Sequence, residues 1–130
     1  MRIEVNSLPP VECSPNSRAH WSKRYKASRL YQAEVFYACV DERNKLEMQL
    51  RRTSFLPFNK ARLDLTFIFS CSRRRDEDNL RAQFKPGQDA LVQAQLLADD
   101  NPDNLIMGKI NIIVDPKRAP RTIIELEKIY

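Results

Sequence analysis

The chain is poor in the residues that build several common catalytic and structural sites. Its 130 residues include one histidine, His20, and three cysteines. A histidine-rich zinc site and a Ser-His-Asp triad both depend on histidine, so a single one argues against either. Cys13, Cys39 and Cys71 are widely spaced and form no CxxC pair, which indicates reduced thiols of a cytosolic protein. We expect Cys39 and Cys71 in the core.

Long apolar runs are also missing. No stretch approaches the roughly 18 consecutive apolar residues of a membrane-spanning helix. No signal-peptide pattern follows Met1, so we expect a cytoplasmic protein with no membrane partner. An apolar content of 42% over this length favours a single domain, residues 1–130, with its own core. The formal charge of +5 suits a polyanionic partner, although a solvated basic surface would give the same number.

Hydrophobic periodicity predicts the order β-α-β-α-β-β. The expected elements are a strand in 1–8, a long helix (or two in tandem) from Asn16 or Ser17 to about Met48, a loop in 51–60, a strand in 63–71, a helix within 79–98, and strands in 105–114 and 122–129. This order predicts an α+β domain, in which a mixed sheet has its helices packed on one face.

The most informative segment follows the central strand and reads Arg73-Arg74-Arg75-Asp76-Glu77-Asp78-Asn79. In an extended backbone, Asp76 and Asp78 would point to the same side. Converging carboxylates favour a cation such as Mg²⁺ or Mn²⁺, and the arginines favour a ligand that carries phosphates. Asp99 or Asp100, beyond the next helix, can return to the same edge. Three carboxylates near a lysine or arginine suit metal-assisted hydrolysis of a phosphodiester.

Several short motifs occur here in one order. They are Arg74-Arg75-Asp76-Glu77-Asp78-Asn79-Leu80, Lys85-Pro86, Asp89-Ala90-Leu91 and Leu97-Ala98-Asp99-Asp100, preceded by Leu8-Pro9-Pro10 and Ser14-Pro15-Asn16. This ordered set resembles the RusA family of Holliday-junction resolvases, most strongly over residues 73–101. The resemblance implies a RusA-like fold and a homodimeric, bacterial or phage-encoded endodeoxyribonuclease. Such an enzyme nicks four-way DNA junctions symmetrically in recombination and repair. It uses Mg²⁺, with Mn²⁺ as a substitute, and no small-molecule cofactor.

Matched by position, the resemblance implies three metal-binding and catalytic carboxylates: Asp76, Asp78 and Asp100. It also implies that Lys85 is the catalytic lysine. The segment between Asn79 and Lys85 is about three residues longer than the family's usual spacing. A continuous helix would place Lys85 about 10 Å along the axis from Asp78. A helix opened by Pro86 could return Lys85 to the site, and Arg81 is the substitute cation if it does not.

The expected contacts to DNA phosphates are basic residues near the acidic segment and on the first helix: Arg73, Arg74, Arg75, Arg81, Lys23 and Lys26. A basic helix face can equally serve solubility. We expect His20 and Trp21 to cap and pack rather than to contact DNA. The apolar loop residues Phe55, Leu56 and Phe58 are expected to pack locally.

Structural alternatives stay open at the acidic segment. Asp76 and Asp78 can be a helix N-cap and a first-turn acid, and Asp89 can be a structural partner of Lys85. Two other functions stay open, the first because the longer spacing between Asn79 and Lys85 can impair catalysis. One is a junction-binding protein with impaired catalysis. The other is a cytosolic protein with a purely structural acidic cluster, which would show no salt-dependent affinity for DNA.

Overall fold

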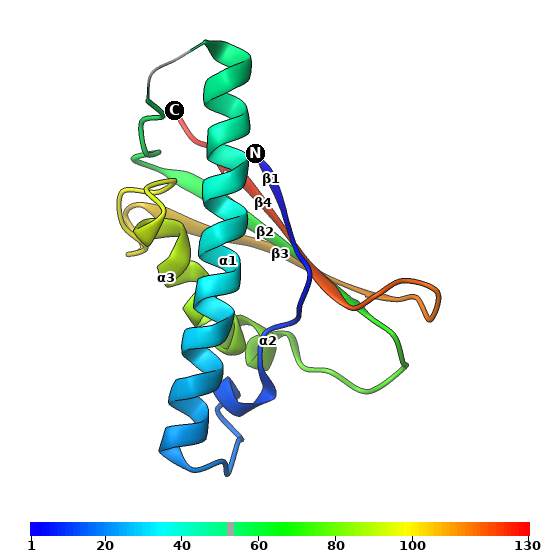
Figure 1. The fold of residues 1–130 in the computed structure, drawn as a ribbon. Helices are drawn as coiled ribbons and strands as arrows, with labels where there is room; N and C mark the ends of the chain where they lie inside the picture. The colour runs from blue at the N-terminus through cyan, green and yellow to red at the C-terminus, as the bar shows by residue number, and fades with distance from the viewer. Residues whose placement is uncertain (52–53) are drawn as a thin grey trace.

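The structure, a computed structural model, describes residues 1–51 and 54–130. Its elements are β1 (Arg2–Val5), the 3₁₀ turn η1 (Val11–Cys13), α1 (Trp21–Leu50), β2 (Ala61–Phe69), α2 (Glu77–Gln83), α3 (Lys85–Gln93), β3 (Leu105–Val114) and β4 (Arg121–Lys128). Over the described residues, the chain forms one small α+β domain with three α-helices and a mixed four-stranded sheet (Figure 1). The predicted α+β class is confirmed.

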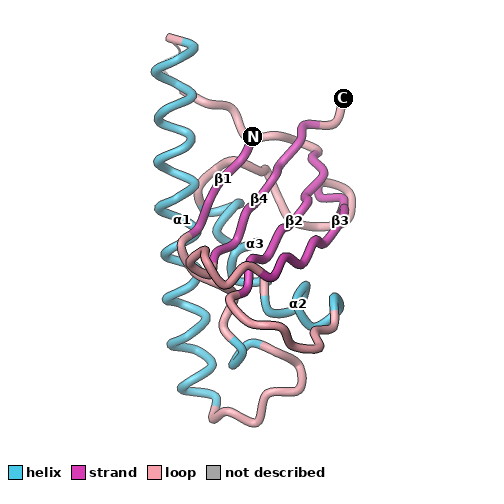
Figure 2. Tube along the Cα trace, turned by 90° about the vertical axis from the view of Figure 1, so that its right-hand side faces the viewer, coloured by secondary structure: helices cyan, strands magenta, loops and turns pink. Residues whose placement is uncertain are grey.

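The sheet has the strand order β1-β4-β2-β3 (Figure 2). β2 and β3 are parallel, and β4 is antiparallel to both β2 and β1. A parallel pair needs a crossover connection, and here the crossover contains α2 and α3. The chain therefore leaves the end of β2, passes through these two helices and returns to the start of β3.

The core lies between one face of the sheet and the helices. Because side chains alternate along a strand, β2 presents Leu63, Leu65 and Phe67 to the same side, and all three are buried. The ring of Phe84 packs against this layer. Its centroid lies 6.5 Å from that of Phe67 and 6.3 Å from that of Tyr31 on α1. Phe84 thus fixes the point where the crossover meets the core.

The crossover contains two short helices rather than one. Phe84 separates α2 from α3, and Pro86 lies in the first turn of α3. Proline suits this position because its missing N–H would have no partner inside the helix. Leu80 at the middle of α2 and Phe84 at the break are both buried in the core.

The long first helix is continuous, but it begins later than expected. Its N-cap is His20, whose Nδ1 accepts a hydrogen bond from the backbone N–H of Ser22 at 3.2 Å. Asn16 and Ser17 instead belong to the preceding turn. The capping role expected of His20 is confirmed, whereas Trp21 is exposed and does not pack into the core. Among the described helices, α1 included, none has the length and apolar character needed to cross a bilayer.

Two other expectations had mixed outcomes. Cys39 is buried, but Cys71 is exposed because β2 ends at Phe69. In the loop before β2, the rings of Phe55 and Phe58 lie 5.4 Å apart and pack against the core, as expected. Leu56 between them points to solvent. Residues 52 and 53 of that expected loop lie outside the described range.

Candidate active site

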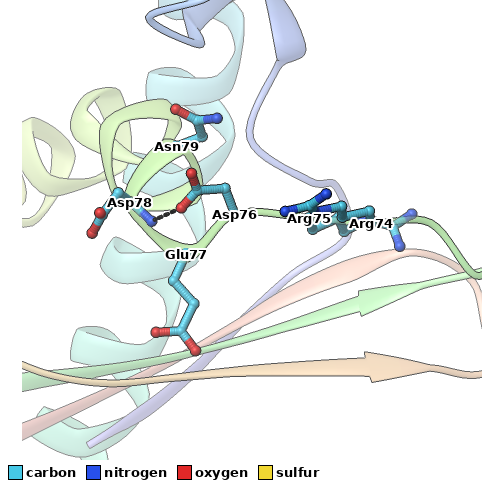
Figure 3. A pocket seen from close by; sticks show the side chains of 6 residues that line it. All are labelled: Arg74, Arg75, Asp76, Glu77, Asp78 and Asn79. Atoms are coloured by element: carbon cyan, nitrogen blue, oxygen red, sulfur yellow. Dashed lines mark hydrogen bonds between the residues drawn. The ribbon is translucent and has the colours of Figure 1, made fainter.

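The acidic segment lies at the start of α2. Asp76 is the N-cap residue, and its Oδ1 accepts a hydrogen bond from the backbone N–H of Asp78 at 2.9 Å. The helix begins at Glu77, so the extended backbone expected through Asp76 and Asp78 is not observed. Successive helical residues are rotated by about 100°, which turns these side chains apart. In Figure 3, Asp76 points toward Asn79, whereas Glu77 and Asp78 point away from it.

An open hollow lies at this turn. It is lined by Arg74, Arg75, Asp76, Glu77, Asp78 and Asn79. The local geometry is that of an N-cap with acids in the first helical turn, which stabilises the helix on its own. The same hollow also gathers carboxylate and amide oxygens beside guanidinium groups, so it has the composition of a site for a cation and a phosphate.

A second charged group lies at the start of α3. The Nζ of Lys85 lies 2.5 Å from Oδ2 of Asp100 and 2.7 Å from Oδ1 of Asp89. The side-chain amide of Gln88 also donates to Asp100 Oδ2, at 3.2 Å. The Lys85–Asp89 pair confirms the structural role suggested for Asp89. The Lys85–Asp100 contact joins two residues that only the family resemblance had linked.

The pKa values of Lys85 and Asp100 are both shifted in this group. The pKa of Asp100 is lowered, chiefly by the hydrogen bond from Lys85 and also by its charge, against partial desolvation. Desolvation works to lower the pKa of Lys85, but the hydrogen bonds and charges of Asp100 and Asp89 outweigh it and raise that pKa. Lys85 is therefore a permanent cation at physiological pH and not a general base.

The expected site residues fall into two groups. Asp76 and Asp78 lie at the start of α2, and Lys85 and Asp100 lie together at the start of α3. Within residues 1–51 and 54–130, no hydrogen bond or ion pair joins the two groups. Over the same ranges, no three histidine, cysteine, aspartate or glutamate side chains gather as a metal ion would require. The three aspartates do not converge here as the resemblance implied.

The donor set at the start of α2 nevertheless fits Mg²⁺ chemically. Mg²⁺ prefers hard oxygen ligands and usually binds through one or two carboxylates together with water and substrate phosphate. Asp76 and Asp78 supply two such carboxylates in an exposed hollow, with Arg74 beside it. Asp100, by contrast, is neutralised by Lys85 and is not part of that hollow.

The arginines near the hollow divide into exposed and anchored side chains. Arg73 and Arg74 are exposed. The guanidinium carbon of Arg75 lies 3.6 Å from the ring centroid of Phe69, and its Nη1 donates to the carbonyl oxygen of Arg73 at 3.2 Å. Arg81 is also anchored, because its Nη2 donates to the carbonyl oxygen of Gly108 on β3 at 3.0 Å. Lys85, and not Arg81, is therefore the cation that lies with an expected acid.

Sequence reasoning missed two features of this region. Gln88, one helical turn after Lys85, helps to hold Asp100. A groove also joins Lys85 to Arg24 and Tyr25 on α1. The expected contacts Lys23 and Lys26 are exposed on the same helix segment. Only the contact between α1 and α3 reveals the groove, since its sides are about sixty residues apart in sequence.

No known protein-family profile matches the chain. A protein of Xylella fastidiosa (strain Temecula1 / ATCC 700964), described as an uncharacterized protein, is 34% identical to it over 92 residues. The matched region covers 66% of this chain and 52% of that protein, so the chain spans about half the length of the relative. The relative's description names no activity, and the functional assignment therefore depends on the site itself.

Proposed function

We propose that this protein is a Mg²⁺-dependent endodeoxyribonuclease with a RusA-like fold. Its substrate is branched DNA, and it resolves four-way junctions by paired nicks during recombination and repair in a bacterial or phage-infected cytoplasm. One observation supports this proposal more than any other. Lys85 and Asp100, a cation and an acid of the ordered motif, meet at 2.5 Å although fifteen residues separate them. Lys85 begins α3, directly after the break at Phe84.

The residues have distinct roles in this proposal. Asp76 and Asp78 would hold the ion, and a bound Mg²⁺ would supply water activation and charge neutralisation at the scissile phosphate. Lys85 remains protonated and stabilises the negative charge that develops on the phosphoryl oxygens. Asp100 and Asp89 orient Lys85 by holding its ammonium group. Arg73 and Arg74 position the DNA backbone through its phosphates.

Paired nicking requires two active sites. A two-fold homodimer supplies them in opposed orientation, because an isologous interface relates identical surfaces. We therefore propose a homodimer, which light scattering of the protein in solution tests directly. A monomer at the concentrations where junctions are cleaved in pairs would contradict this part of the proposal.

The central experiment is cleavage of a synthetic four-way junction with and without Mg²⁺. Asp76→Asn and Asp78→Asn should abolish nicking and leave junction binding intact or stronger, because each removes a negative charge facing DNA. Asp103→Asn is the matched control, since Asp103 is an exposed acid in the turn after α3. Undiminished nicking by both site variants with Mg²⁺ present would refute the proposed site.

A second function is favoured by the divergent carboxylates at the start of α2. A junction-binding protein without catalysis would need the basic surface but no grouped acids (Figure 3). Titration with Mg²⁺ separates the two, because a binder would retain the junction and release no nicked product. A protein with a purely structural acidic cluster would show no salt-dependent affinity for DNA.

A further inference from the structure

The buried stripe of α1 continues beyond the core as exposed aromatic residues. Tyr31, Val35 and Cys39 are buried, whereas Trp21 and Tyr25, which continue the same helical period, are 72% and 59% exposed. Residues four apart are neighbours on a helix surface, so the two rings share one side. The first turns of α1 extend past the sheet (Figure 1), so the strands do not cover these rings.

The charge of the chain is concentrated around these two rings. Residues 13–33 contain five of the 22 lysines and arginines and none of the 17 aspartates and glutamates. The remaining residues are therefore balanced, with 17 basic against 17 acidic side chains, and this segment accounts for the whole net charge of +5. The five basic residues are Arg18, Lys23, Arg24, Lys26 and Arg29. A surface of this sign attracts a polyanion.

One cation of this segment lies against one of the two rings, and a third ring lies beside the other. The guanidinium carbon of Arg29 lies 5.9 Å from the ring centroid of Tyr25. The ring of His20 lies 5.6 Å from that of Trp21. Positive charge and a flat aromatic surface thus lie next to each other. Backbone phosphates and stacked bases of a nucleic acid need this combination.

This surface is continuous with the charged group of Lys85 at the start of α3. The groove between the start of α1 and the junction of α2 with α3 is lined by Arg24, Tyr25, Ser28, Lys85 and Asp89, among others. A strand whose phosphate lies at Lys85 can therefore continue along the groove to Arg24 and Tyr25. An apolar protein partner would match the two rings but would leave the surrounding cations unpaired.

We propose that Trp21, Tyr25 and the cations around them form a binding surface for unpaired DNA bases next to the cleavage site. The two rings stack on successive bases, and the basic side chains neutralise the phosphates. The choice of DNA as the ligand rests on the proposed function. The stacking surface distinguishes single-stranded from fully paired DNA, because paired bases offer no free faces to the rings.

Trp21 is the only tryptophan in the chain, so its fluorescence reports on this surface directly. The probe is single-stranded oligothymidylate, titrated into the full-length protein in EDTA so that no cleavage occurs. We expect the emission of Trp21 to be quenched at saturation by the oligothymidylate and to change little with a blunt duplex. Tyr25→Leu should raise the Kd for the single strand about 5- to 100-fold, since stacking is lost from one base.

Two variants make the test specific. Tyr25→Phe keeps the ring and should keep the affinity of the wild type. Tyr37→Leu removes another exposed aromatic residue of α1, which is 70% exposed but lies beside Asp41 and Glu42, and it should leave the Kd unchanged. All of the substituted side chains are exposed, so unaltered thermal unfolding is expected and checks that each variant is folded.

The outcomes separate this inference from the proposed function. Equal affinity and equal quenching with duplex, or a Tyr25→Leu variant that binds like Tyr37→Leu, would overturn the stacking surface. Junction cleavage by the wild-type protein would be untouched by that result. Conversely, quenching by the single strand in a protein that never nicks a junction would support the surface and reject the nuclease.

Discussion

The Nζ of Lys85 lies 2.5 Å from Oδ2 of Asp100 and makes a second ion pair, at 2.7 Å, with Asp89. The contact exists because α3 begins immediately after Phe84 and carries Lys85 in its first turn. Asp100 returns to the same place after α3 and the turn that follows it. The two helices and this turn thus form one unit, in which a buried phenylalanine determines where a surface cation lies.

We predict that Lys85, and not Arg81, supplies the cation of the proposed reaction. Lys85→Ala should reduce junction cleavage by at least about ten-fold, because charge stabilisation at the phosphate is lost. Lys85→Arg should retain part of the rate. Arg81→Ala should lower the free energy of unfolding by about 1 kcal/mol, because the hydrogen bond to Gly108 is lost. The cleavage rate of the folded variant should stay unchanged. An unchanged rate in Lys85→Ala together with inactive Arg81→Ala would transfer the role to Arg81.

Gly87→Ala tests how tightly the junction between α2 and α3 is packed. A Cβ on Gly87 would lie 2.5 Å from the ring of Phe84, which is fully buried between Tyr31 and Phe67. Alanine gains about 1 kcal/mol of helix propensity over glycine. Crowding a well-packed core costs about 1–3 kcal/mol, so crowding should win. We expect a lower urea midpoint and, because Phe84 must shift, a weaker Lys85–Asp100 contact with slower cleavage.

Asn44→Ala is the control for the propensity effect. Asn44 is exposed on α1, so alanine there raises the helix propensity without crowding a neighbouring side chain. This variant should be slightly more stable than the wild type. A Gly87→Ala protein that gains stability to the same extent would show that Phe84 moves freely, contrary to the packing described here.

The strands were predictable because their signal is local. Alternation of apolar and polar residues identified β2 from its own sequence, and Leu63, Leu65 and Phe67 do face the core. The end of β2 could not be predicted from the local sequence. The alternation continues to Cys71, but the paired residues of β2 end at Ile68 opposite β4 and at Phe69 opposite β3. A strand ends where its partners end, and the partners lie elsewhere in the chain.

The site residues were identifiable, but their arrangement was not. The order of the motif selected Asp76, Asp78, Lys85 and Asp100, while the extra residues before Lys85 left two placements open. The helix breaks at Phe84, which is buried against Tyr31 and Phe67, a tertiary contact that no periodicity encodes. Lys85 then lies with Asp89 and Asp100 and, over the described residues, makes no hydrogen bond or ion pair with Asp76 or Asp78. The start of α1 was expected too early, at Asn16 or Ser17, because histidine is a less common N-cap and the true start depends on the path of the preceding turn.

Asp64 should make the stability of the sheet depend on pH. Its Oδ1 accepts a hydrogen bond from the backbone N–H of Lys109 at 2.7 Å, next to the register shift between β2 and β3, and Arg62 pairs with it. Desolvation works to raise the pKa of Asp64, but these contacts outweigh it and hold the pKa below the ordinary value of 3.8. A lowered pKa stabilises the folded state above that value, and the stabilisation is lost as the pH falls through the folded-state pKa.

Asp64→Asn should therefore lower the free energy of unfolding by about 1–2 kcal/mol near pH 7. The difference in the free energy of unfolding between this variant and the wild type should shrink below about pH 4. At such pH, Asp64 of the wild type also loses its charge. Asp41→Asn is the control, because Asp41 forms only an exposed pair with Lys45 and should cost less than about 0.5 kcal/mol. A difference that stays constant from neutral to acid pH would show that the charge of Asp64 is not what stabilises the sheet.

The arginines before α2 should differ in their effect on the salt dependence of DNA binding. Arg74 is exposed at the edge of the acidic hollow, so it can release a counterion when it meets a phosphate. Arg75 is held over Phe69, because its guanidinium carbon lies 3.6 Å from the centroid of the phenylalanine ring. We expect Arg74→Ala to weaken junction binding in EDTA and to reduce the slope of log K against log salt by about 1. Arg75→Ala should keep the slope and lose about 0.5–2 kcal/mol of stability instead. Equal losses of slope in the two variants would mean that Arg75 leaves Phe69 to bind DNA.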